Sequence, residues 1–422
     1  MAVPLNTGGT AIVFRLKFSI FALGCTNVYK MNQEASRCLL CKKPKCSEAC
    51  PVHTDVPTAM KLYREGNLTD AAKLLFENNP LSAITSQVCD WQLFCKGHCV
   101  LNARKMPVRW YEVEQEISMS YLLDAHVEID VPDNGKKVAV IGAGPCGIAA
   151  SMWLRKKGVS VTLFDSFDRV GGVLRYGIPE FRLDKKYVDA YERILQEIGV
   201  VFVGKSTLGK EITIESLRKE FDAILVAAGA WVAKEMRIPG EELPGVIHAL
   251  EFLKEPSSYE LGKRVIVIGG GNVAMDACRT AIRRGCDTTV VYRKTFENMP
   301  ANHLEVEEAR KEGVKFRVFE VPVEVRKDGD RIYAILRDCE NVEENGKITT
   351  RVIDGTDHEL DFDTMIVAVS EKADKSILDG YDHEENPDIF KAGDYFYGPR
   401  TVVEAVQSAK LAVADMISYL QV

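Results

Sequence analysis

Residues 137–147 read KVAVIGAGPCG, an apolar run that leads directly into three closely spaced glycines. The first five residues favour a buried β-strand, and the residues from Gly147 onward favour a helix. In such a turn the first glycine permits the tight bend, the second lets backbone N–H groups approach a pyrophosphate, and the third lets helix and strand pack closely. The stretch predicts a dinucleotide-binding turn, whose candidate residues are Gly142, Ala143, Gly144, Pro145 and Gly147.

The segment after this helix supplies the second part of a dinucleotide site. Residues 159–165, VSVTLFD, favour another strand, and this strand ends in the acid Asp165. A carboxylate at this position is where the hydroxyl pair of a ribose is held. A glycine triplet alone also occurs in ordinary structural turns. Strand, triplet, helix, strand and acid in this order are more specific, and they predict a dinucleotide site.

The same pattern recurs further along the chain. The strand RVIVI (264–268) leads into a second glycine turn with the candidate residues Gly269, Gly270, Gly271, Asn272 and Val273. The next strand ends at Arg293 and Lys294, where an NAD site would carry an acid. Two cations there favour the 2′-phosphate of NADPH, although a solvated pair of charges at a strand end is the alternative. Two dinucleotide folds in one chain suggest FAD in the first and NADPH in the second.

A third piece is expected to close the flavin domain. Residues 388–420 place Gly393 and Asp394 between a short strand and an amphipathic helix that begins near Thr401. We therefore expect an α/β protein with two Rossmann-like domains and a helical domain in front of them. The predicted division is 1–30 as an extension outside the fold, 31–131 as the helical domain, 136–238 with 367–422 as the FAD domain, and 239–366 as the NAD(P)H domain.

Composition limits the possible classes of function. The chain has 422 residues, of which 46% are apolar and 27% charged, so it can form two or three ordinary hydrophobic cores. The net charge of −7 and the lack of a long basic run argue against a nucleic-acid partner. Residues 11–25 resemble a signal or lipoprotein segment, but they are too short and too charged to span a membrane. A natural start at Met31, no membrane partner and a cytoplasmic location are the expectations.

Seven of the twelve cysteines crowd into residues 38–99. Their close spacing in a long chain favours metal ligation over disulfides. Zinc is the alternative to iron, but seven cysteines in two boxes, one closed by Cys50-Pro51, suit two cubane clusters better. The short helices expected between the boxes bury little by themselves, so cluster binding is expected to stabilise this domain. The candidate ligands are Cys38, Cys41, Cys46, Cys50, Cys89, Cys95, Cys99 and the carboxylate Glu114.

The two boxes, SRCLLCKKPKCSEACP (36–51) and VCDWQLFCKGHCVLN (88–102), resemble those of a known family. The family contains the small, electron-input subunit of bacterial glutamate synthase and the flavin and iron–sulfur part of dihydropyrimidine dehydrogenase. The resemblance implies two [4Fe-4S] clusters with crossed ligation. Cys38, Cys41, Cys46 and Cys99 would hold one, and Cys50, Cys89, Cys95 and a non-cysteine residue the other. Ungapped alignment selects Glu114 as that residue, and a shift by one position would select Gln115.

The resemblance also extends the flavin site and shows one departure. Residues 171–183, GGVLRYGIPEFRL, resemble the segment that embraces the flavin, which adds Gly171, Gly172 and Arg182 to the FAD candidates. Asp394, Thr401 and Val402 join them from the C-terminal segment. Near residue 370 the family has a glycine, whereas this chain has Ser370 followed by Glu371. That turn lies near the nicotinamide in the family, so the choice between NADPH and NADH stays open.

These parts predict an oxidoreductase in which FAD and the clusters carry the chemistry and no side chain acts as a catalytic acid or base. Hydride would pass from NADPH to FAD, and electrons would leave through the clusters to a partner. The leading hypothesis is a glutamate synthase-type large subunit on a separate chain, with ferredoxin as a further candidate partner. The alternatives are the input subunit of a dihydropyrimidine dehydrogenase or a ferredoxin:NADP oxidoreductase, and a non-catalytic redox-sensing or assembly subunit.

Overall fold

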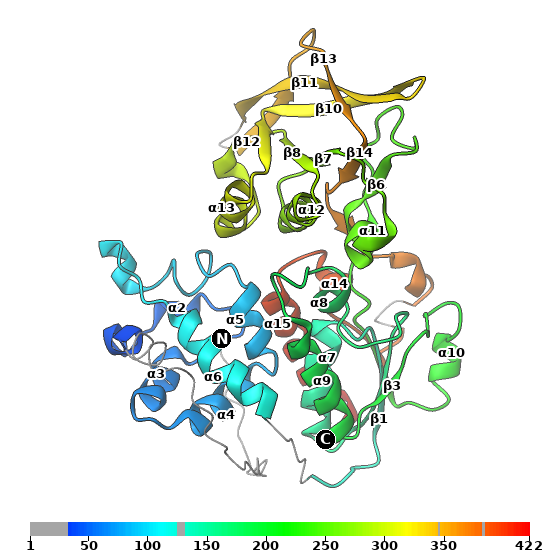
Figure 1. The fold of residues 1–422 in the computed structure, drawn as a ribbon. Coiled ribbons are helices and arrows are strands. Elements are labelled where there is room, and N and C mark those ends of the chain that lie inside the picture. Colours follow the sequence, from blue (N-terminus) through cyan, green and yellow to red (C-terminus); the bar gives the residue numbers. More distant parts are fainter. Residues whose placement is uncertain (1–32, 125–130, 345–346, 382–384) are drawn as a thin grey trace. The chain divides into compact units, whose positions relative to one another are not determined.

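A computed structural model describes residues 33–124, 131–344, 347–381 and 385–422 (Figure 1). The predicted extension 1–30 and the alternative start at Met31 lie outside the described residues. The described chain divides into two compact units. One comprises the residues up to 175, 180–230 and 373–422, and the other comprises 176–179 and 231–372. The helical cysteine segment therefore shares a unit with the FAD-type fold, and the division falls at 230/231 and 372/373 rather than at 238/239 and 366/367.

The cysteine segment consists of short helices and loops. Its elements are α2 (Lys45–Glu48), α3 (Val56–Arg64), α4 (Leu68–Asn78), α5 (Ser82–Val88), the 3₁₀ helix η1 (Val100–Arg104) and α6 (Trp110–Asp124). Local signals set several ends, since Asp55 accepts a hydrogen bond from the Thr58 N–H to cap α3, and Asn67 caps α4 in the same way. The first cysteine box consists of α2, which contains Cys46, and the loops on either side of it, and the cysteines of the second box lie between α5 and η1.

The first unit contains a five-stranded parallel sheet with the order β16-β4-β1-β2-β3. The strands are β1 (Lys137–Ile141), β2 (Ser160–Phe164), β3 (Val201–Val203), β4 (Ala223–Val226) and β16 (Ile389–Lys391). The main helices are α7 (Pro145–Arg155), α9 (Lys185–Glu197) and α15 (Val402–Leu420), with the short α8 (Val173–Tyr176), α10 (Ile214–Leu217) and α14 (Asp394–Tyr397). The C-terminal strand β16 pairs with β4, so the end of the chain completes the sheet that β1 begins.

Helix α15 connects the two parts of the first unit. It packs along α7, the helix that follows the first glycine turn, and it also contacts α5 of the cysteine segment. Lys410 on α15 donates a hydrogen bond of 2.7 Å to the Asn78 side chain at the end of α4. The indole N–H of Trp153 on α7 donates to the Glu77 carbonyl at 3.2 Å. These contacts join the flavin-type fold to the cysteine helices within one unit.

The second unit repeats the parallel arrangement, with the strand order β6-β14-β7-β8-β9. Its strands are β6 (Val246–His248), β7 (Arg264–Ile268), β8 (Asp287–Tyr292), β9 (Lys315–Val318) and β14 (Thr364–Val367). Its helices are α11 (Ala249–Lys254), η2 (Pro256–Ser258), α12 (Asn272–Arg283), η3 (Phe296–Asn298) and α13 (His303–Lys311). A core that includes Phe252, Val267, Met275 and Ile366 fills the space between α11, α12 and the sheet.

An antiparallel sheet that the sequence analysis did not predict extends the second unit. It consists of β10 (Glu320–Asp328), β11 (Arg331–Glu344), β12 (Lys347–Val352) and β13 (His358–Phe362), in which β11 pairs with the other three. A small antiparallel pair, β5 (Val232–Ala233) with β15 (Glu371–Lys372), lies where the chain enters and leaves this unit. The 3₁₀ helix η4 (Lys375–Leu378) follows in the first unit.

Candidate cofactor and cluster sites

The structure brings cysteines from both boxes around one pocket. Cys38, Cys41 and Cys46 of the first box line it together with Cys95 and Cys99 of the second box. The pKa of the Cys46 thiol is raised to about 11, chiefly by burial and in smaller part by negative charge on Cys38 and Cys99. Four of these five thiols, those of Cys38, Cys41, Cys46 and Cys99, are the set that the resemblance implies for one cluster.

A second group of acidic side chains gathers beside the first. Burial raises the pKa of the Cys89 thiol, and negative charges on Glu114, Cys50 and Cys95 add to that effect. Burial also raises the pKa of Glu114 to about 8, although a hydrogen bond from the Ser82 hydroxyl at 3.4 Å opposes the shift. Three thiols and one carboxyl thus share a buried space, as the resemblance implies for the other cluster.

This collection of donors fits metal clusters. The seven box cysteines are all free thiols in the described chain. Holding seven half-buried potential thiolates and a buried carboxylate close together costs free energy unless a cationic centre compensates their charge. Thiolates are the ligands that iron–sulfur clusters use, and metal binding stabilises the folded form of the segment that supplies them. The residues present therefore suit two [4Fe-4S] clusters better than an empty helical domain.

Glu114 and Gln115 occupy different surroundings on α6. The Glu114 carboxyl is an electrostatic neighbour of three thiols, Cys50, Cys89 and Cys95, whose pKa values its negative charge raises. The Gln115 side-chain amide instead donates a hydrogen bond of 2.7 Å to the Ser86 carbonyl. Successive residues of a helix point about 100° apart, so only one of this pair can face the thiols. The geometry places Glu114 among the thiols and Gln115 against the backbone of α5.

Close backbone contacts explain the glycines of the first dinucleotide turn. Gly142 has a φ of +108°, and a Cβ there would lie 2.3 Å from the Ala227 carbonyl oxygen. A Cβ on Gly147 would lie 1.8 Å from the Gly142 carbonyl oxygen. By contrast, a Cβ on Gly144 would have no atom nearer than 3.8 Å, at Gly172. Gly144 therefore leaves open space where a pyrophosphate approaches in a fold of this kind.

The 171–172 segment lies against the same turn. The Gly171 N–H donates a hydrogen bond of 2.8 Å to the Ala143 carbonyl. Gly172 has a φ of +52°, and its Cβ would come within 2.7 Å of the Gly144 Cα. Backbone proximity thus requires glycine at position 172. At Gly171 the φ of +137° requires it, and a Cβ there would lie 2.8 Å from the side chains of Arg175 and Val188. Arg182 is half-buried between α8 and α9, and Pro145 begins α7.

Asp165 is tied to the glycine turn itself. One carboxylate oxygen accepts a hydrogen bond of 2.6 Å from the Ala143 N–H, and the other accepts one of 2.8 Å from the Phe167 N–H. Burial raises the pKa of this carboxyl, while the two N–H groups lower it. The side chain therefore orients the turn, a role that the sequence analysis missed. Its predicted contact with a ribose stays a prediction.

The C-terminal candidates meet the N-terminal end of α7. Gly393 has a φ of +64°, and its Cβ would lie 3.1 Å from the Cβ of Cys146, which follows Pro145. The Gly393 N–H donates a hydrogen bond of 2.8 Å to the Ser408 hydroxyl on α15. Thr401 caps α15 in a capping box with Glu404, and Val402 is the first helical residue. The structure thereby brings Asp394 and Thr401 to the same part of the fold as the first glycine turn.

The second glycine turn has a similar construction. Gly269 has a φ of +142°, and its Cβ would lie 2.3 Å from the Ala368 carbonyl oxygen, while a Cβ on Gly270 would strike the Tyr292 ring at 2.6 Å. No atom lies within 4 Å of a Cβ placed on Gly271. A hydrogen bond also stabilises the turn, because the Ala301 N–H donates to the Gly270 carbonyl at 3.0 Å. Gly271 is therefore the open position of this turn.

The remaining candidates lie around this turn. Asn272 is exposed at the start of α12, and its side-chain oxygen accepts a hydrogen bond of 2.9 Å from the Asn302 N–H. Val273 is half-buried. Arg293 is exposed and Lys294 half-buried just after β8. Neither cation has a side-chain hydrogen bond or ion pair within the residues that the structure describes. Both are therefore available to an anion.

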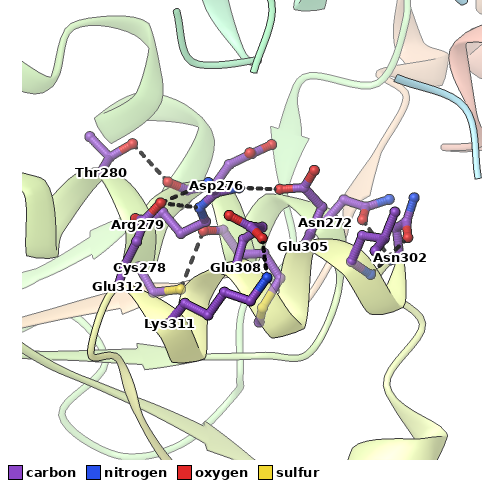
Figure 2. A network of polar contacts seen from close by, with 12 residues as sticks. Asn272, Asp276, Cys278, Arg279, Thr280, Asn302, Glu305, Glu308, Lys311 and Glu312 are labelled. Carbon is purple, nitrogen blue, oxygen red and sulfur yellow. Dashed lines mark hydrogen bonds and ion pairs between the residues drawn. The ribbon is translucent and has the colours of Figure 1, made fainter. Parts of the chain in front are cut away.

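A buried ion-pair network fixes α12 to α13 (Figure 2). Arg279 is 5% exposed and forms ion pairs with Glu305 and, at 2.8 Å, with Glu312. Burial would raise the pKa of Glu312, but hydrogen bonds from Arg283 and Arg279 lower it to about 2. The network holds the helix that begins at the second glycine turn. No sequence pattern pointed to it, because its partners lie 26 and 33 residues apart in the chain.

Ser370, the departure from the family pattern, has an unusual backbone. Its φ is +103°, a region that side-chain-bearing residues rarely adopt and glycine adopts freely. Its carbonyl accepts a hydrogen bond of 3.0 Å from the Lys234 N–H, and its hydroxyl lies 3.4 Å from the Lys234 ammonium. Burial raises the pKa of the neighbouring Glu371, while Lys234 lowers it. The turn thus keeps a conformation suited to glycine although a serine occupies it.

We expect Ser370→Gly to raise the free energy of unfolding by about 1 kcal/mol, because a strained φ costs of order 1–3 kcal/mol and glycine removes that cost. Chemical denaturation of the loaded protein measures the change. Ser370→Ala is the matched control, since it removes the hydroxyl and keeps the Cβ. An equal gain from both substitutions would contradict the backbone explanation.

Comparisons with known proteins show the family to which the chain belongs. Residues 136–409 match the pyridine nucleotide-disulphide oxidoreductase family, and residues 17–124 match dihydropyrimidine dehydrogenase domain II, a 4Fe-4S cluster domain. The glutamate synthase [NADPH] small chain of Halomonas elongata is 33% identical over 92% of this chain and 90% of its own length. That of Escherichia coli K12 is 31% identical over 92% and 91%. The chain belongs to the glutamate synthase small-chain family.

Membership of this family confirms the predicted resemblance, fold class and cofactors. The chain is an NADPH-dependent flavin and iron–sulfur oxidoreductase whose cofactors are FAD, NADPH and 4Fe-4S clusters. A solved structure, Mycobacterium tuberculosis FprA in complex with NADPH, shares the fold with a TM-score of 0.58 and 18% identity over 69% of this chain and 86% of FprA. Across the described ranges no helix is long and apolar enough to cross a membrane.

Proposed function

We propose that this chain is the electron-input subunit of a glutamate synthase-type enzyme, whose catalytic large subunit is a separate polypeptide. The observation that carries the proposal is that the parts expected to bind FAD and the clusters lie in the same compact unit. The open first glycine turn, helix α15 and the two groups of cluster ligands belong to one unit, in which α15 contacts both α7 and α5. The relatives named as small chains match over nearly their whole length, which supports a partner of the same kind.

In this mechanism the residues of the chain bind and orient FAD and NADPH. The backbone of the turn at Gly144 and the N-terminus of α7 would hold the FAD pyrophosphate, and Asp165 keeps that turn in shape. Gly271 and α12 would do the same for NADPH, with Arg293 and Lys294 at its 2′-phosphate. When bound, FAD accepts hydride from the nicotinamide, and the clusters carry single electrons away.

The two groups of cysteine and glutamate ligands define two cluster sites. Cys38, Cys41, Cys46 and Cys99 would hold one cluster, and Cys50, Cys89, Cys95 and Glu114 the other. Since Cys50 belongs to the first box and Cys99 to the second, the crossing ties the two boxes together. In the second group, burial is the largest cause of the raised pKa values of the Cys89 and Cys95 thiols. No side chain needs to exchange a proton with the substrate.

The test is reconstitution. The loaded chain should oxidise NADPH with an artificial acceptor, and adding a glutamate synthase large chain should couple that oxidation to formation of glutamate from glutamine and 2-oxoglutarate. Co-purification from the native source identifies the large chain to use. Oxidation of NADPH without glutamate formation with that chain would overturn the proposed partner. A flavin that NADPH does not bleach would favour the redox-sensing or assembly alternative.

We expect Arg293→Ala combined with Lys294→Ala to raise the KM for NADPH at least about tenfold, because hydrogen bonds to charged groups contribute about 1.5–3 kcal/mol each. The KM for NADH should change little. Steady-state oxidation of both coenzymes with an artificial acceptor measures this. Lys315→Ala is the matched control, since Lys315 pairs with Asp287 at the opposite end of the same strands. Equal losses with both coenzymes would argue against a 2′-phosphate contact.

A further inference from the structure

The loops that carry the cluster cysteines expose large apolar side chains. The exposed fractions are 63% for Leu39, 59% for Leu93, 61% for Met106 and 41% for Val100. Leu39 and Val100 also line the pocket of the first cysteine group. Apolar side chains held in water add nothing to stability, and their gathering at one functional site is typical of a recognition surface.

Hydrogen bonds from two arginines to backbone carbonyls hold these loops in place. Arg64 donates to the carbonyls of Ala35, at 2.8 Å, and of Cys38, which fixes the backbone beside Leu39. Arg37 donates to the Met106 carbonyl at 2.6 Å and pairs with the buried Glu34. The apolar side chains are thus presented from an ordered backbone. A preorganised surface loses less conformational entropy on binding a partner.

The same loops are rich in cations. In residues 38–50 and 89–106 there are six cations and two carboxylates, Glu48 and Asp90, although the whole chain has a net charge of −7. No ion pair or side-chain hydrogen bond engages any of the six cations within the described part of the chain. Unpaired cations around an apolar centre match a partner with the opposite charge. They are Lys42, Lys43, Lys45, Lys96, Arg104 and Lys105.

We infer that these apolar side chains and cations form a docking surface for an acidic electron-acceptor protein. The inference rests on the proposed function and specifies where the partner binds and what charge it carries. Electron transfer requires the acceptor to approach a cluster closely, and Leu39, Lys45 and Val100 of this surface line the pocket of the Cys38, Cys41, Cys46 and Cys99 group. An anionic membrane would meet the same charges, but it would not place a protein acceptor at this pocket.

The test uses the loaded, full chain with NADPH and two haem proteins of opposite charge. Soluble cytochrome b5 is the acidic probe, cytochrome c is the basic probe, and menadione is a small neutral acceptor. We expect a lower KM for cytochrome b5 than for cytochrome c at low ionic strength. Lys42→Glu with Lys43→Glu should raise the KM for cytochrome b5 at least tenfold and flatten its salt dependence. Leu93→Ser with Met106→Ser should raise that KM and leave the salt dependence intact.

Lys157→Glu with Lys219→Glu is the matched control, because both lysines are exposed and lie outside the cysteine segment. Electron paramagnetic resonance of each reduced variant shows whether its clusters are intact. If NADPH reduces neither flavin nor menadione, the proposed function fails. If both are reduced normally but the Lys42 and Lys43 variant behaves like the control, only the docking surface is overturned. A competing outcome is that the wild-type chain self-associates or binds phosphatidylserine vesicles through this surface. If the Lys42 and Lys43 variant loses either property, the surface binds a second copy of the chain or an anionic membrane, and the inference is overturned.

Discussion

Glu114→Ala is expected to remove one of the two clusters and leave the other in place. The Glu114 carboxyl is buried, and its negative charge acts on the thiols of Cys50, Cys89 and Cys95. Iron and sulfide should fall by about half, given four irons in each cluster. Metal analysis and electron paramagnetic resonance of anaerobically purified protein measure the loss.

The neighbouring residue offers a matched control for this prediction. Gln115→Ala should keep both clusters, because the Gln115 amide is engaged with the Ser86 carbonyl at 2.7 Å. Cys99→Ala should remove the other cluster, the one whose pocket the first box lines. The signal that survives in Cys99→Ala should then be the signal that Glu114→Ala abolishes. Loss of the same signal in both variants would contradict crossed ligation, and loss in Gln115→Ala would move the eighth ligand to that position.

Gly144→Ala is expected to abolish FAD binding without unfolding the chain. The added Cβ would meet no protein atom nearer than 3.8 Å, and the φ of −79° is ordinary for alanine. The stability of the FAD-free chain should therefore fall by no more than about 1 kcal/mol, because alanine is a poorer helix N-cap than glycine. The Cβ would instead occupy the path by which backbone N–H groups reach the pyrophosphate. Flavin content after purification and thermal unfolding of the FAD-free chain measure the two effects.

Gly147→Ala separates a cofactor effect from a folding effect. Its Cβ would lie 1.8 Å from the Gly142 carbonyl oxygen, so the strand and helix would have to move apart. Overpacking of this kind typically costs about 1–3 kcal/mol or more. We expect Gly147→Ala to lower stability and flavin content together, whereas Gly144→Ala lowers chiefly the flavin content. Full flavin occupancy in Gly144→Ala would place the pyrophosphate elsewhere.

Local sequence signals were sufficient for much of the fold. The two glycine turns are recognisable because strand, turn and helix are adjacent in the chain. Within the first turn, Gly147 also meets the backbone of Gly142, only five residues away. The antiparallel sheet β10–β13 was not predicted. The pairing of β11 with β13 depends on partners such as Ala334 and Leu360, which are distant in the chain and leave no short-range pattern. The β10–β11 hairpin, by contrast, turns at Gly329 and Asp330, a local signal that the sequence analysis did not use.

The candidate sites divide in the same way. The amino-acid sequence by itself determined which residues are chemically able to bind FAD, NADPH and clusters, because residue type and spacing along the chain decide that ability. Only the tertiary structure decided which of them meet. It placed Glu114 rather than Gln115 among the thiols, tied Asp165 to the Ala143 N–H, and gave Ser370 a φ suited to glycine. These outcomes depend on long-range packing and on the direction of each side chain, which the sequence encodes only through the fold.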